Sequence, residues 1–330
     1  MENILVIRLK AIGDVIFTLP AVGALREQFP AAKITFLTSK ENASLLRGFP
    51  QVNEVIALDR AALRSGNPLK ITRVFFGLLR RLRAGKFSLV VDFQGFGETA
   101  WLARITGAPQ RWGSVYGSGR RWAYTRGEER EEQIHPADWN LLLLHRCGVS
   151  ARASTNEFAL PADALAAARQ FFTENSLDPG RPTLVIQPLT STAQKNWPLE
   201  KFLAVARDAR ESGAQVIFVG GPGDGPGLEP ARAEKFCVAT GLPLLVSAGL
   251  VQLAALMLGG DTGLGHLAVA QGRRVIMVMR HSRPGACVPF RHPDWAVVPD
   301  QSCHIQEITI EAVLNETRKA LTPPARNASC

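Results

Sequence analysis

The chain has 330 residues, 46% of them hydrophobic, and a formal net charge of +9. This length allows two domains that each bury a core, and no apolar run approaches the roughly 20 residues that span a bilayer. The five cysteines show no Cys-x-x-Cys spacing and the histidines no i,i+4 pair, so neither disulfides nor a metal site are expected. The N-terminus lacks a signal-peptide pattern, which predicts a cytoplasmic protein.

Continuous aliphatic runs alternate with helical periodicity in the first half of the chain. Strands are expected at 4–9, 34–37, 52–58 and 87–93, and helices at 14–28, 43–47 and 69–85. Pro20 either kinks the first helix or marks its effective first turn. Strand, helix and strand at this spacing are typical of a doubly wound parallel sheet.

The same alternation restarts after a helix at 162–174. Strands are expected at 183–187, 215–219 and 274–279, and helices at 198–212, 250–258, 263–271 and 309–321. We therefore predict an α/β protein with two Rossmann-like domains that face each other across a cleft. The predicted segments are an N-terminal domain at 1–155, a linker and helix at 156–180, and a C-terminal domain at 181–330. The last helix is a candidate to pack back on the N-terminal domain.

Two glycine- and aspartate-containing turns stand where helices should begin. The first is Gly13-Asp14, after the first strand, and the second runs from Gly259 to Ala268 and includes Asp261, Thr262 and His266. The N–H groups at a helix start bind phosphate and other anions. One turn would hold a phosphorylated donor, and the other would offer a carboxylate to a second substrate.

Positive charge is concentrated in one segment. Residues 60–130 hold 14 lysines and arginines against 4 acidic residues, which implies an anionic partner. The helix at 69–85 has an apolar face made of Ile71, Val74, Phe75, Leu78, Leu79 and Leu82. Opposite this face lie, for the most part, Lys70, Arg73, Arg80 and Arg81. It is either a sheet-packing helix with a solvated basic face or one that also contacts an anionic membrane.

Several motifs in chain order resemble the ADP-heptose:lipopolysaccharide heptosyltransferases, inverting glycosyltransferases of family 9 with the GT-B fold. They are residues 7–15 (IRLKAIGDV) with Thr18-Leu19-Pro20, Asp92-Phe93-Gln94-Gly95, Lys195-Asn196-Trp197-Pro198, and residues 261–268 (DTGLGHLA). Arg111-Trp112-Gly113 and His135 fit weaker family positions. The resemblance implies two Rossmann-like domains and transfer of heptose from ADP-heptose.

Two stretches depart from the family pattern. The family normally has an apolar strand before the Asp-Thr-Gly turn, whereas here the helix expected at 250–258 runs almost directly into Asp261. This strand is therefore predicted to be shortened or missing. Residues 280–284 (RHSRP) replace the usual Gly-Pro-Thr-Asp-Pro. Both departures flank the expected donor site.

Asp14 is the candidate general base. Inverting sugar transfer needs one carboxylate to take the proton of the attacking hydroxyl, and a nucleoside diphosphate leaves without protonation. The alternative role of Asp14 is a helix cap. Lys195 is expected to assist as a catalytic charge on the leaving diphosphate, and the less favoured alternative is a solvated loop lysine.

The donor site is expected around the second turn. Thr190, Ser191 and Thr192 would add hydroxyl donors to the phosphates, and the N–H groups of Thr262, Gly263 and Leu264 would bind them. The resemblance implies that Asp261 and His266 contact the donor sugar. Either Asp224 or Glu229 is expected to hold the ribose.

An anionic, lipid-linked acceptor would meet basic side chains of the N-terminal domain: Arg8, Lys10, Arg111, Arg120, Arg121 and His135. Arg120 and Arg121 are equally consistent with plain surface charge. The leading hypothesis is a monomeric, metal-independent enzyme without a cofactor, peripheral on the inner face of the cytoplasmic membrane, that transfers heptose to the lipopolysaccharide inner core. The alternatives are another donor or acceptor, or a nucleotide-sugar-binding protein without transferase activity. No nucleic-acid recognition motif is visible.

Overall fold

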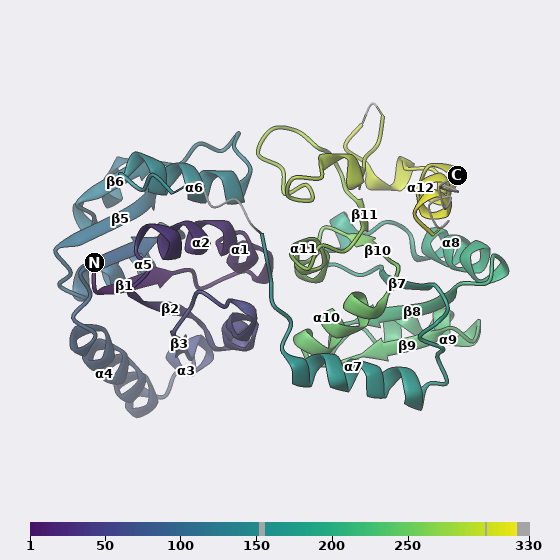
Figure 1. Cartoon of the computed structure of the whole chain (residues 1–330), viewed down its shortest axis with the longest axis horizontal. Coiled ribbons are helices and arrows are strands. Elements are labelled where there is room, and N and C mark those ends of the chain that lie inside the picture. Colours follow the sequence, from purple (N-terminus) through teal and green to yellow (C-terminus); the bar gives the residue numbers. More distant parts are fainter. Residues whose placement is uncertain (152–155, 301, 322–330) are drawn as a thin grey trace, which may run out of the picture. The chain divides into compact units, whose positions relative to one another are not determined.

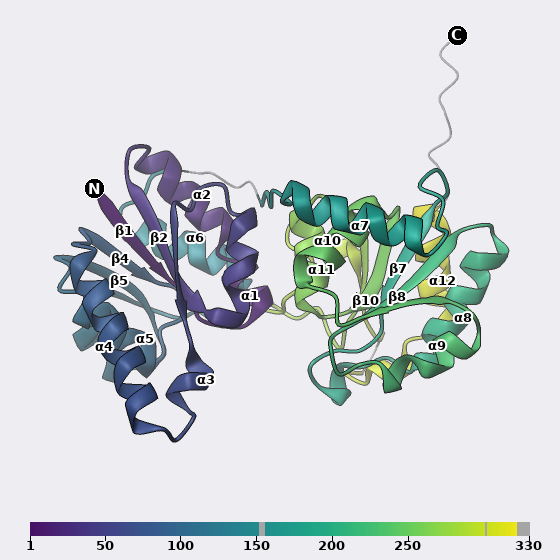
Figure 2. The same ribbon diagram turned by 90° about the horizontal axis from the view of Figure 1, so that it is seen from below.

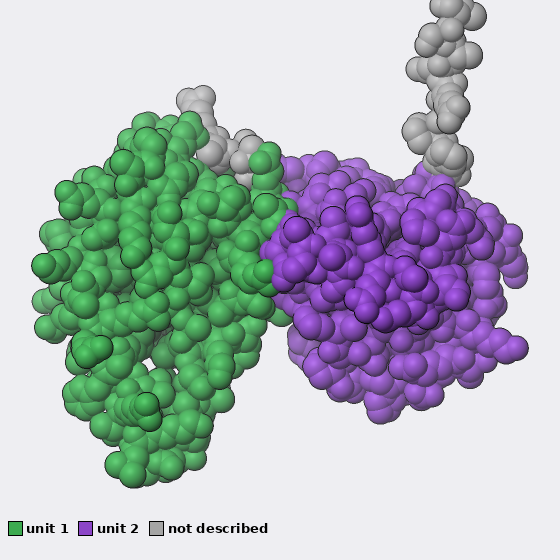
Figure 3. Space-filling model, turned by 60° about the horizontal axis from the view of Figure 1, so that its bottom comes forward, with its two compact units in different colours: residues 1–159 green, residues 160–330 purple. Residues whose placement is uncertain are grey.

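The computed structural model describes residues 1–151, 156–300 and 302–321. The chain divides into two compact units, Met1–Ala159 and Leu160–Cys330 (Figure 3). The expected boundary at residue 155 falls in the segment 152–155, outside the described residues. Each unit contains one six-stranded parallel sheet with helices packed on it (Figure 1).

In the sheet of the first unit, the strand that comes first in the chain, β1, lies near the centre. The strand order is β3-β2-β1-β4-β5-β6, and every neighbouring pair is parallel. The interior strands are continuous aliphatic runs because helices cover both of their faces. The strands are β1 (Asn3–Ile7), β2 (Lys33–Ser39), β3 (Glu54–Leu58), β4 (Leu89–Asp92), β5 (Gln110–Val115) and β6 (Arg126–Glu129).

Two helical layers cover this sheet. On one face α2 (Leu19–Gln28) packs on α6 (Pro136–Arg146), and α1 (Ile12–Ile16) precedes them. The opposite face carries α4 (Pro68–Ala84), α5 (Gly97–Ile105) and the 3₁₀ helix η2 (Ser118–Ala123), whose apolar residues share one buried cluster (Figure 2). The 3₁₀ helix η1 (Lys40–Gly48) and the short α3 (Arg60–Leu63) complete the unit.

The helix expected at 14–28 is divided into α1 and α2. Phe17 and Thr18 separate the two, and Pro20 stands in the first turn of α2. Proline is tolerated there because first-turn N–H groups lack intrahelical partners. The interpretation of Pro20 as the mark of a first turn is therefore confirmed.

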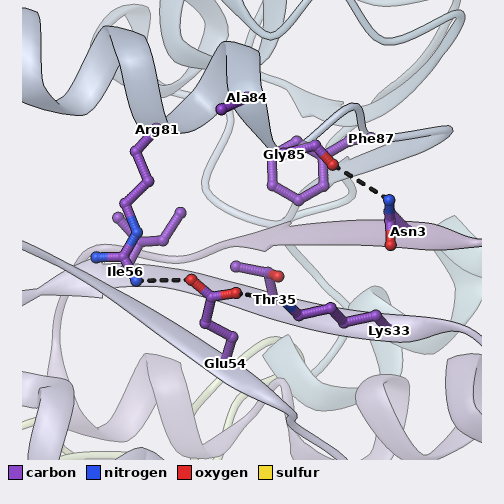
Figure 4. A pocket seen from close by; sticks show the side chains of 9 residues that line it. All are labelled: Asn3, Lys33, Thr35, Glu54, Ile56, Arg81, Ala84, Gly85 and Phe87. Carbon is purple, nitrogen blue, oxygen red and sulfur yellow. Dashed lines mark hydrogen bonds and ion pairs between the residues drawn. The ribbon is translucent and has the colours of Figure 1, made fainter.

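The faces of α4 differ from those expected. Leu78 and Leu82 are buried as predicted, but Phe75 is 45% exposed. Arg81 is not on a free basic face, because it donates to the Glu54 carboxylate at 2.7 Å, beside Lys33 (Figure 4). The hydrogen bonds from Arg81 and Lys33 lower the pKa of Glu54. One of the four basic residues predicted to face outward therefore binds the edge of the sheet.

The second unit repeats the architecture. Its sheet has the order β12-β11-β10-β7-β8-β9, again with parallel neighbours. The strands are β7 (Thr183–Gln187), β8 (Gln215–Gly220), β9 (Cys237–Thr240), β10 (Leu256–Gly260), β11 (Val275–Val278) and β12 (Ala296–Val297). The α-helices are α7 (Ala162–Glu174), α8 (Leu199–Glu211), α9 (Glu229–Ala233), α10 (Leu244–Leu253), α11 (Gly263–Ala270) and α12 (Ile310–Leu321). The described residues of this unit also form the 3₁₀ helices η3 (Ala193–Lys195), η4 (Pro226–Leu228), η5 (Pro293–Trp295) and η6 (Ile305–Glu307).

The prediction of a helix at 250–258 is wrong. Helix α10 ends at Leu253, and β10 follows between β7 and β11. The strand was hard to recognise because it ends in two glycines. A Cβ on Gly259 would lie 2.8 Å from the Gln187 carbonyl oxygen, and one on Gly260 would lie 2.6 Å from the Thr190 methyl group. The strand before Asp261 is thus present, and this apparent departure from the family disappears.

The last helix finds its buried contacts within the second unit. Val313 and Thr317 are buried, α12 packs on α8, and Arg318 donates to the Asp208 carboxylate. The sequence had made this helix a candidate partner of the N-terminal domain. Among the described residues, no helix is long and apolar enough to cross a membrane.

Candidate active site

Asp14 lies at the carboxyl edge of the first sheet. It stands in α1, just after β1, and its Oδ2 lies 2.6 Å from Nη2 of Arg8. The same oxygen accepts the N–H of Ala11 at 3.0 Å, so the capping role is real. The Asp14 side chain is one-third exposed (33%) and Arg8 is largely buried. Asp14 is therefore a helix cap and also an accessible carboxylate held by a guanidinium.

The Asp92-Phe93-Gln94-Gly95 motif supports this loop from β4. Buried Gln94 accepts the N–H groups of Leu9 and Lys10 at 2.8 and 3.3 Å, and Arg8 donates to the Phe93 carbonyl at 2.7 Å. Both contacts fix the backbone that leads to Asp14. In the sequence this motif contributes only to the family resemblance, and no role for Gln94 is predicted from it. Its position directly after a strand was the available signal, because parallel strands end at one edge.

Asp92 is fully buried beneath the same loop. One of its oxygens accepts the N–H groups of Gln94 and Gly95, and the other accepts the Tyr124 hydroxyl at 2.7 Å. Burial raises the pKa of Asp92, and these hydrogen bonds oppose the rise. Gly95 has a φ of +69°, and a Cβ there would lie 1.9 Å from the Ser114 carbonyl oxygen. The turn therefore requires glycine.

The predicted acceptor residues do not all lie together. Arg120 donates to the Gly95 carbonyl at 3.2 Å, which brings it to the same edge as exposed Lys10. His135 caps α6, and the centroid of its ring lies 4.9 Å from the ring centroid of Phe17, the residue after α1. Arg111, in contrast, lies near the start of β5.

The guanidinium of Arg111 donates to backbone carbonyls of Ala108 and Ala123, and burial lowers its pKa. Arg111 thus joins β5 to η2 and is not brought to Asp14. Arg121 is exposed on η2.

Three predicted residues of the second unit form one cluster. Asp261 follows β10, and its two oxygens lie 2.7 Å from Nζ of Lys195 and 3.0 Å from Nε2 of His266. His266 is buried and Asp261 is partly exposed. Burial by itself would raise the pKa of Asp261, but the hydrogen bonds and charges of His266 and Lys195 outweigh it and hold the pKa at about 2. Asp261 is therefore an ionised carboxylate that fixes a lysine.

Thr262 begins helix α11 directly after this cluster. Its hydroxyl accepts the N–H of Gly265 at 3.1 Å and donates to Gln187 Oε1 at 2.7 Å. The N–H groups of Gly263 and Leu264 stand in the first turn, where a helix has no partner for them. Gln187, at the end of β7, was missed in the sequence because nothing but its position after a strand marks it.

The loop after β7 carries the predicted hydroxyl donors. The N–H of Thr190 donates to Oδ1 of Asn196 at 2.8 Å, and Ser191 and Thr192 are exposed. The absence of a side chain at Gly260 lets Thr190 approach β10. The loop thus brings Thr190 against the strand that precedes Asp261.

A cavity of about 230 Å³ opens beside this cluster. Its lining includes Lys195, Asp261, Arg280, His281 and residues 285–287. The stretch that departs from the family pattern, 280–284, therefore contributes basic and imidazole side chains to the candidate donor site. Such side chains suit an anionic ligand.

The two ribose candidates differ in their surroundings. Asp224 accepts the N–H of Gly221 at 2.7 Å, in the turn directly after β8. Glu229 begins α9, is largely exposed and pairs with Arg232 at 3.3 Å. Asp224 lies nearer the carboxyl edge of the sheet, where nucleotide sites form. In the described ranges, no group of three or more His, Cys, Asp or Glu side chains is arranged to hold a metal ion.

Comparison with known proteins agrees with this architecture. The crystal structure of a family 9 glycosyltransferase from Veillonella parvula superposes with a TM-score of 0.86, at 23% identity, and covers 97% of both chains. The E. coli heptosyltransferase WaaC, solved with ADP-2-deoxy-2-fluoro heptose, gives a TM-score of 0.75 at 22% identity and covers 96% of this chain and 99% of its own. The GT-B fold expected from the resemblance is confirmed.

The sequence comparison identifies the family. Glycosyltransferase family 9 (heptosyltransferase) matches residues 75–311. The lipopolysaccharide core heptosyltransferase OpsX of Haemophilus influenzae is 25% identical over 306 residues, which cover 89% of this chain and 83% of OpsX. The protein is thus a glycosyltransferase. It belongs to glycosyltransferase family 9, the heptosyltransferases.

Proposed function

We propose that the protein transfers heptose from ADP-heptose to a sugar of the lipopolysaccharide inner core, with inversion at the anomeric carbon. The family match over residues 75–311 carries the proposal. The relatives named above are heptosyltransferases, and the solved E. coli relative binds an ADP-heptose analogue. The geometry of the two units supplies a role for individual residues.

Asp14 is proposed as the general base. In the transfer step an acceptor hydroxyl loses its proton to the Asp14 carboxylate while its oxygen bonds to the anomeric carbon. The bond from that carbon to the phosphate oxygen breaks, and ADP leaves with the electron pair. Arg8 supports this role because its guanidinium holds the carboxylate at 2.6 Å and so fixes its orientation.

The second unit is proposed to bind ADP-heptose. Lys195 and the first-turn N–H groups of α11 would balance the charge that develops on the diphosphate. The contact with Asp261 supports this role because it fixes the lysine beside the cavity. Asp261 and His266 would contact the sugar, and Asp224 is the preferred ribose residue.

The acceptor is proposed to bind in the first unit. Arg8, Lys10, Arg120 and His135 surround the carboxyl edge near Asp14, and arginine forks suit carboxylates and phosphates. Because lipid-linked core sugars are made at a membrane, we place the enzyme on the inner face of the cytoplasmic membrane. One chain carries both sites, so we expect a monomer, which size-exclusion chromatography tests.

The decisive experiment supplies purified protein with ADP-heptose and a heptose-free, lipid-linked core acceptor. We expect release of ADP and a product heavier by one heptose, measured by mass spectrometry. Calorimetry with ADP, UDP and GDP should show preference for ADP. Transfer from a different sugar nucleotide, with none from ADP-heptose, would assign the protein to another donor.

Metal independence is part of the proposal. Lys195 and the α11 N-terminus supply the positive charge that a metal ion would otherwise bring to the diphosphate. We expect EDTA to leave turnover unchanged. Loss of turnover in EDTA that Mg²⁺ or iron restores would contradict this part while leaving sugar transfer intact.

A further inference from the structure

Exposed aromatic side chains gather on one helical layer of the first unit. Apart from Met1, every large hydrophobic residue that is exposed among the described residues lies between Leu69 and Trp122. Six of these are aromatic and come from α4, the start of α5, and the η2 region: Phe75, Phe76, Phe96, Trp101, Tyr116 and Trp122. We call them the aromatic surface. Helices α4 and α5 lie on the same side of the sheet (Figure 2).

The rings of the aromatic surface contact one another across elements. Trp101 of α5 meets Trp122 of η2 with a centroid separation of 4.8 Å, and Phe96 meets Tyr116 at 5.5 Å. Trp101 and Trp122 nevertheless remain 59% and 49% exposed. These tryptophans are therefore not core residues, and their apolar area is left for another partner.

Basic residues accompany these rings and acidic ones are scarce. Residues 69–126 contain 11 lysines and arginines against two acidic residues, Asp92 and Glu98. Asp92 is buried, and Glu98 pairs with Arg60 at 3.1 Å. Arg73, Arg80 and Arg104 are exposed in the same helical layer. The surface thus combines apolar rings with uncompensated positive charge.

We propose that the aromatic surface docks on an anionic lipid bilayer, with Trp101 and Trp122 at the level of the lipid headgroups. Tryptophan and tyrosine favour this depth because the ring is apolar and the N–H or O–H remains hydrated. Neighbouring arginines bind the anionic headgroups. The inference rests on the proposed function in one respect: the acceptor is lipid-linked, so docking would bring the enzyme to it.

A bilayer explains this surface better than a nucleic acid does. Leu69, at the start of α4, is 83% exposed, and Phe76 is 59% exposed. An aliphatic side chain gains nothing from a phosphate backbone, whereas acyl chains accommodate it. The Trp101 and Trp122 rings also meet at 65°, an arrangement that does not form a row of free ring faces for stacked bases.

The tryptophans allow a direct test. Of the six in the chain, Trp112, Trp139 and Trp197 are buried and Trp295 is partly buried, which leaves Trp101 and Trp122 as the exposed pair. The probe is a vesicle of phosphatidylethanolamine and phosphatidylglycerol with brominated acyl chains. We expect co-sedimentation with these vesicles and quenching of tryptophan fluorescence. Neutral phosphatidylcholine vesicles should bind roughly tenfold or more weakly.

Two double variants distinguish the loss of tryptophan fluorescence from the loss of apolar area. Trp101→Phe with Trp122→Phe keeps apolar rings, so it should still bind vesicles but lose the quenching. Trp101→Ser with Trp122→Ser should weaken binding roughly tenfold or more, because little apolar area remains to insert. Thermal unfolding of each variant checks that the fold is retained.

A matched pair of charge variants tests the position of the positive residues. Arg73→Gln with Arg80→Gln should weaken vesicle binding roughly tenfold. Arg169→Gln with Lys319→Gln, two exposed residues of the second unit, makes the same change in net charge and should have little effect. Equal losses in both pairs would show that only net charge matters and would overturn the proposal.

Other outcomes also overturn it. The first two are vesicle binding by the parent without quenching and vesicle binding by the Trp→Ser variant as strong as that of the parent. The other two are a preference for single-stranded DNA over vesicles, and a parent dimer that the Trp→Ser substitutions dissociate into monomers. Turnover of ADP-heptose with a short, lipid-free acceptor is measured in parallel. The Trp→Ser variant should keep that turnover, so failed docking and failed sugar transfer give different results.

Discussion

Nη2 of Arg8 lies 2.6 Å from Oδ2 of Asp14, and the two residues stand on opposite sides of the turn that follows β1. Nη1 of Arg8 donates to the Phe93 carbonyl at 2.7 Å, at the end of β4. The guanidinium therefore ties the candidate base to the neighbouring strand. A carboxylate held in this way loses little conformational freedom when the acceptor arrives, which is how positioned groups accelerate a reaction.

Replacement of Asp14 tests the base. Asp14→Asn should lower kcat roughly 10²- to 10⁴-fold, because general-base catalysis contributes about that factor. Calorimetry should find ADP affinity nearly unchanged, since the proposed donor residues are in the second unit. Turnover close to that of the parent would leave Asp14 with the capping contact to Ala11 as its only role.

Replacement of Arg8 tests its positioning role. Arg8→Lys keeps the charge, but a single ammonium cannot reproduce the planar fork that reaches both Asp14 and Phe93. We expect kcat to fall roughly ten- to a hundredfold, with little change in the KM for ADP-heptose. A change confined to the KM for the acceptor would instead make Arg8 an acceptor-binding residue.

The Lys195 and Asp261 pair should control donor binding. Lys195→Ala should weaken ADP binding roughly tenfold or more, because a charge-assisted hydrogen bond to phosphate is lost. His266→Ala should act more on ADP-heptose than on ADP if His266 contacts the sugar. Arg169→Ala, which removes the same charge at an exposed position of α7, serves as the control. If the ADP affinity of Lys195→Ala equals that of the parent, Lys195 does not bind the diphosphate.

The low pKa of Asp261 predicts a change in stability in acid. A pKa of about 2 in the folded protein, against an ordinary value of 3.8, means that folding favours the ionised form. Its contribution is present above the ordinary pKa and is lost as the pH falls towards 2. Denaturant unfolding should show the parent losing its advantage over Asp261→Asn between about pH 4 and pH 2. A constant difference over this range would contradict the assignment.

Asp92 should show the opposite dependence. Burial raises the pKa of Asp92 above 3.8 in the folded protein. The free energy of unfolding should therefore fall as the pH rises above 3.8, because the unfolded chain ionises there more readily than the folded protein. Asparagine cannot ionise, can accept the N–H groups of Gln94 and Gly95, and can donate to the Tyr124 hydroxyl. The free energy of unfolding of Asp92→Asn, relative to the parent, should therefore increase with pH.

Asp92→Ala is the comparison for this experiment. It leaves buried donors without an acceptor and should be less stable than Asp92→Asn by roughly 2–4 kcal/mol at every pH. If Asp92→Asn instead loses stability relative to the parent as the pH rises, the buried carboxylate is the preferred form.

Local pattern was sufficient for most interior strands of the two sheets, but not for β5 and β10. Strands such as β1 and β7 are continuous aliphatic runs because both of their faces are covered, and that burial is visible in the residues themselves. The edge strands β6 and β9 escaped prediction because β6 is polar and β9 has only four residues, so neither shows such a run. His266 lies close to Asp261 because a strand end and the following helix start are adjacent in the chain. Lys195 reaches Asp261 from the region after β7, a strand that pairs with β10.

The sequence by itself thus determined the fold class, the family and the turns that carry Asp14 and Asp261. Tertiary structure decided what depends on partners distant in the chain. Strand β10 exists because β7 and β11 pair with Leu256–Gly260, although its glycines have little strand propensity of their own. Gln94 and Arg81 have their roles because Leu9 and Glu54 lie beside them in space. The exposure of Trp101 likewise follows from how α5 packs, since a side chain's burial depends on which elements cover it.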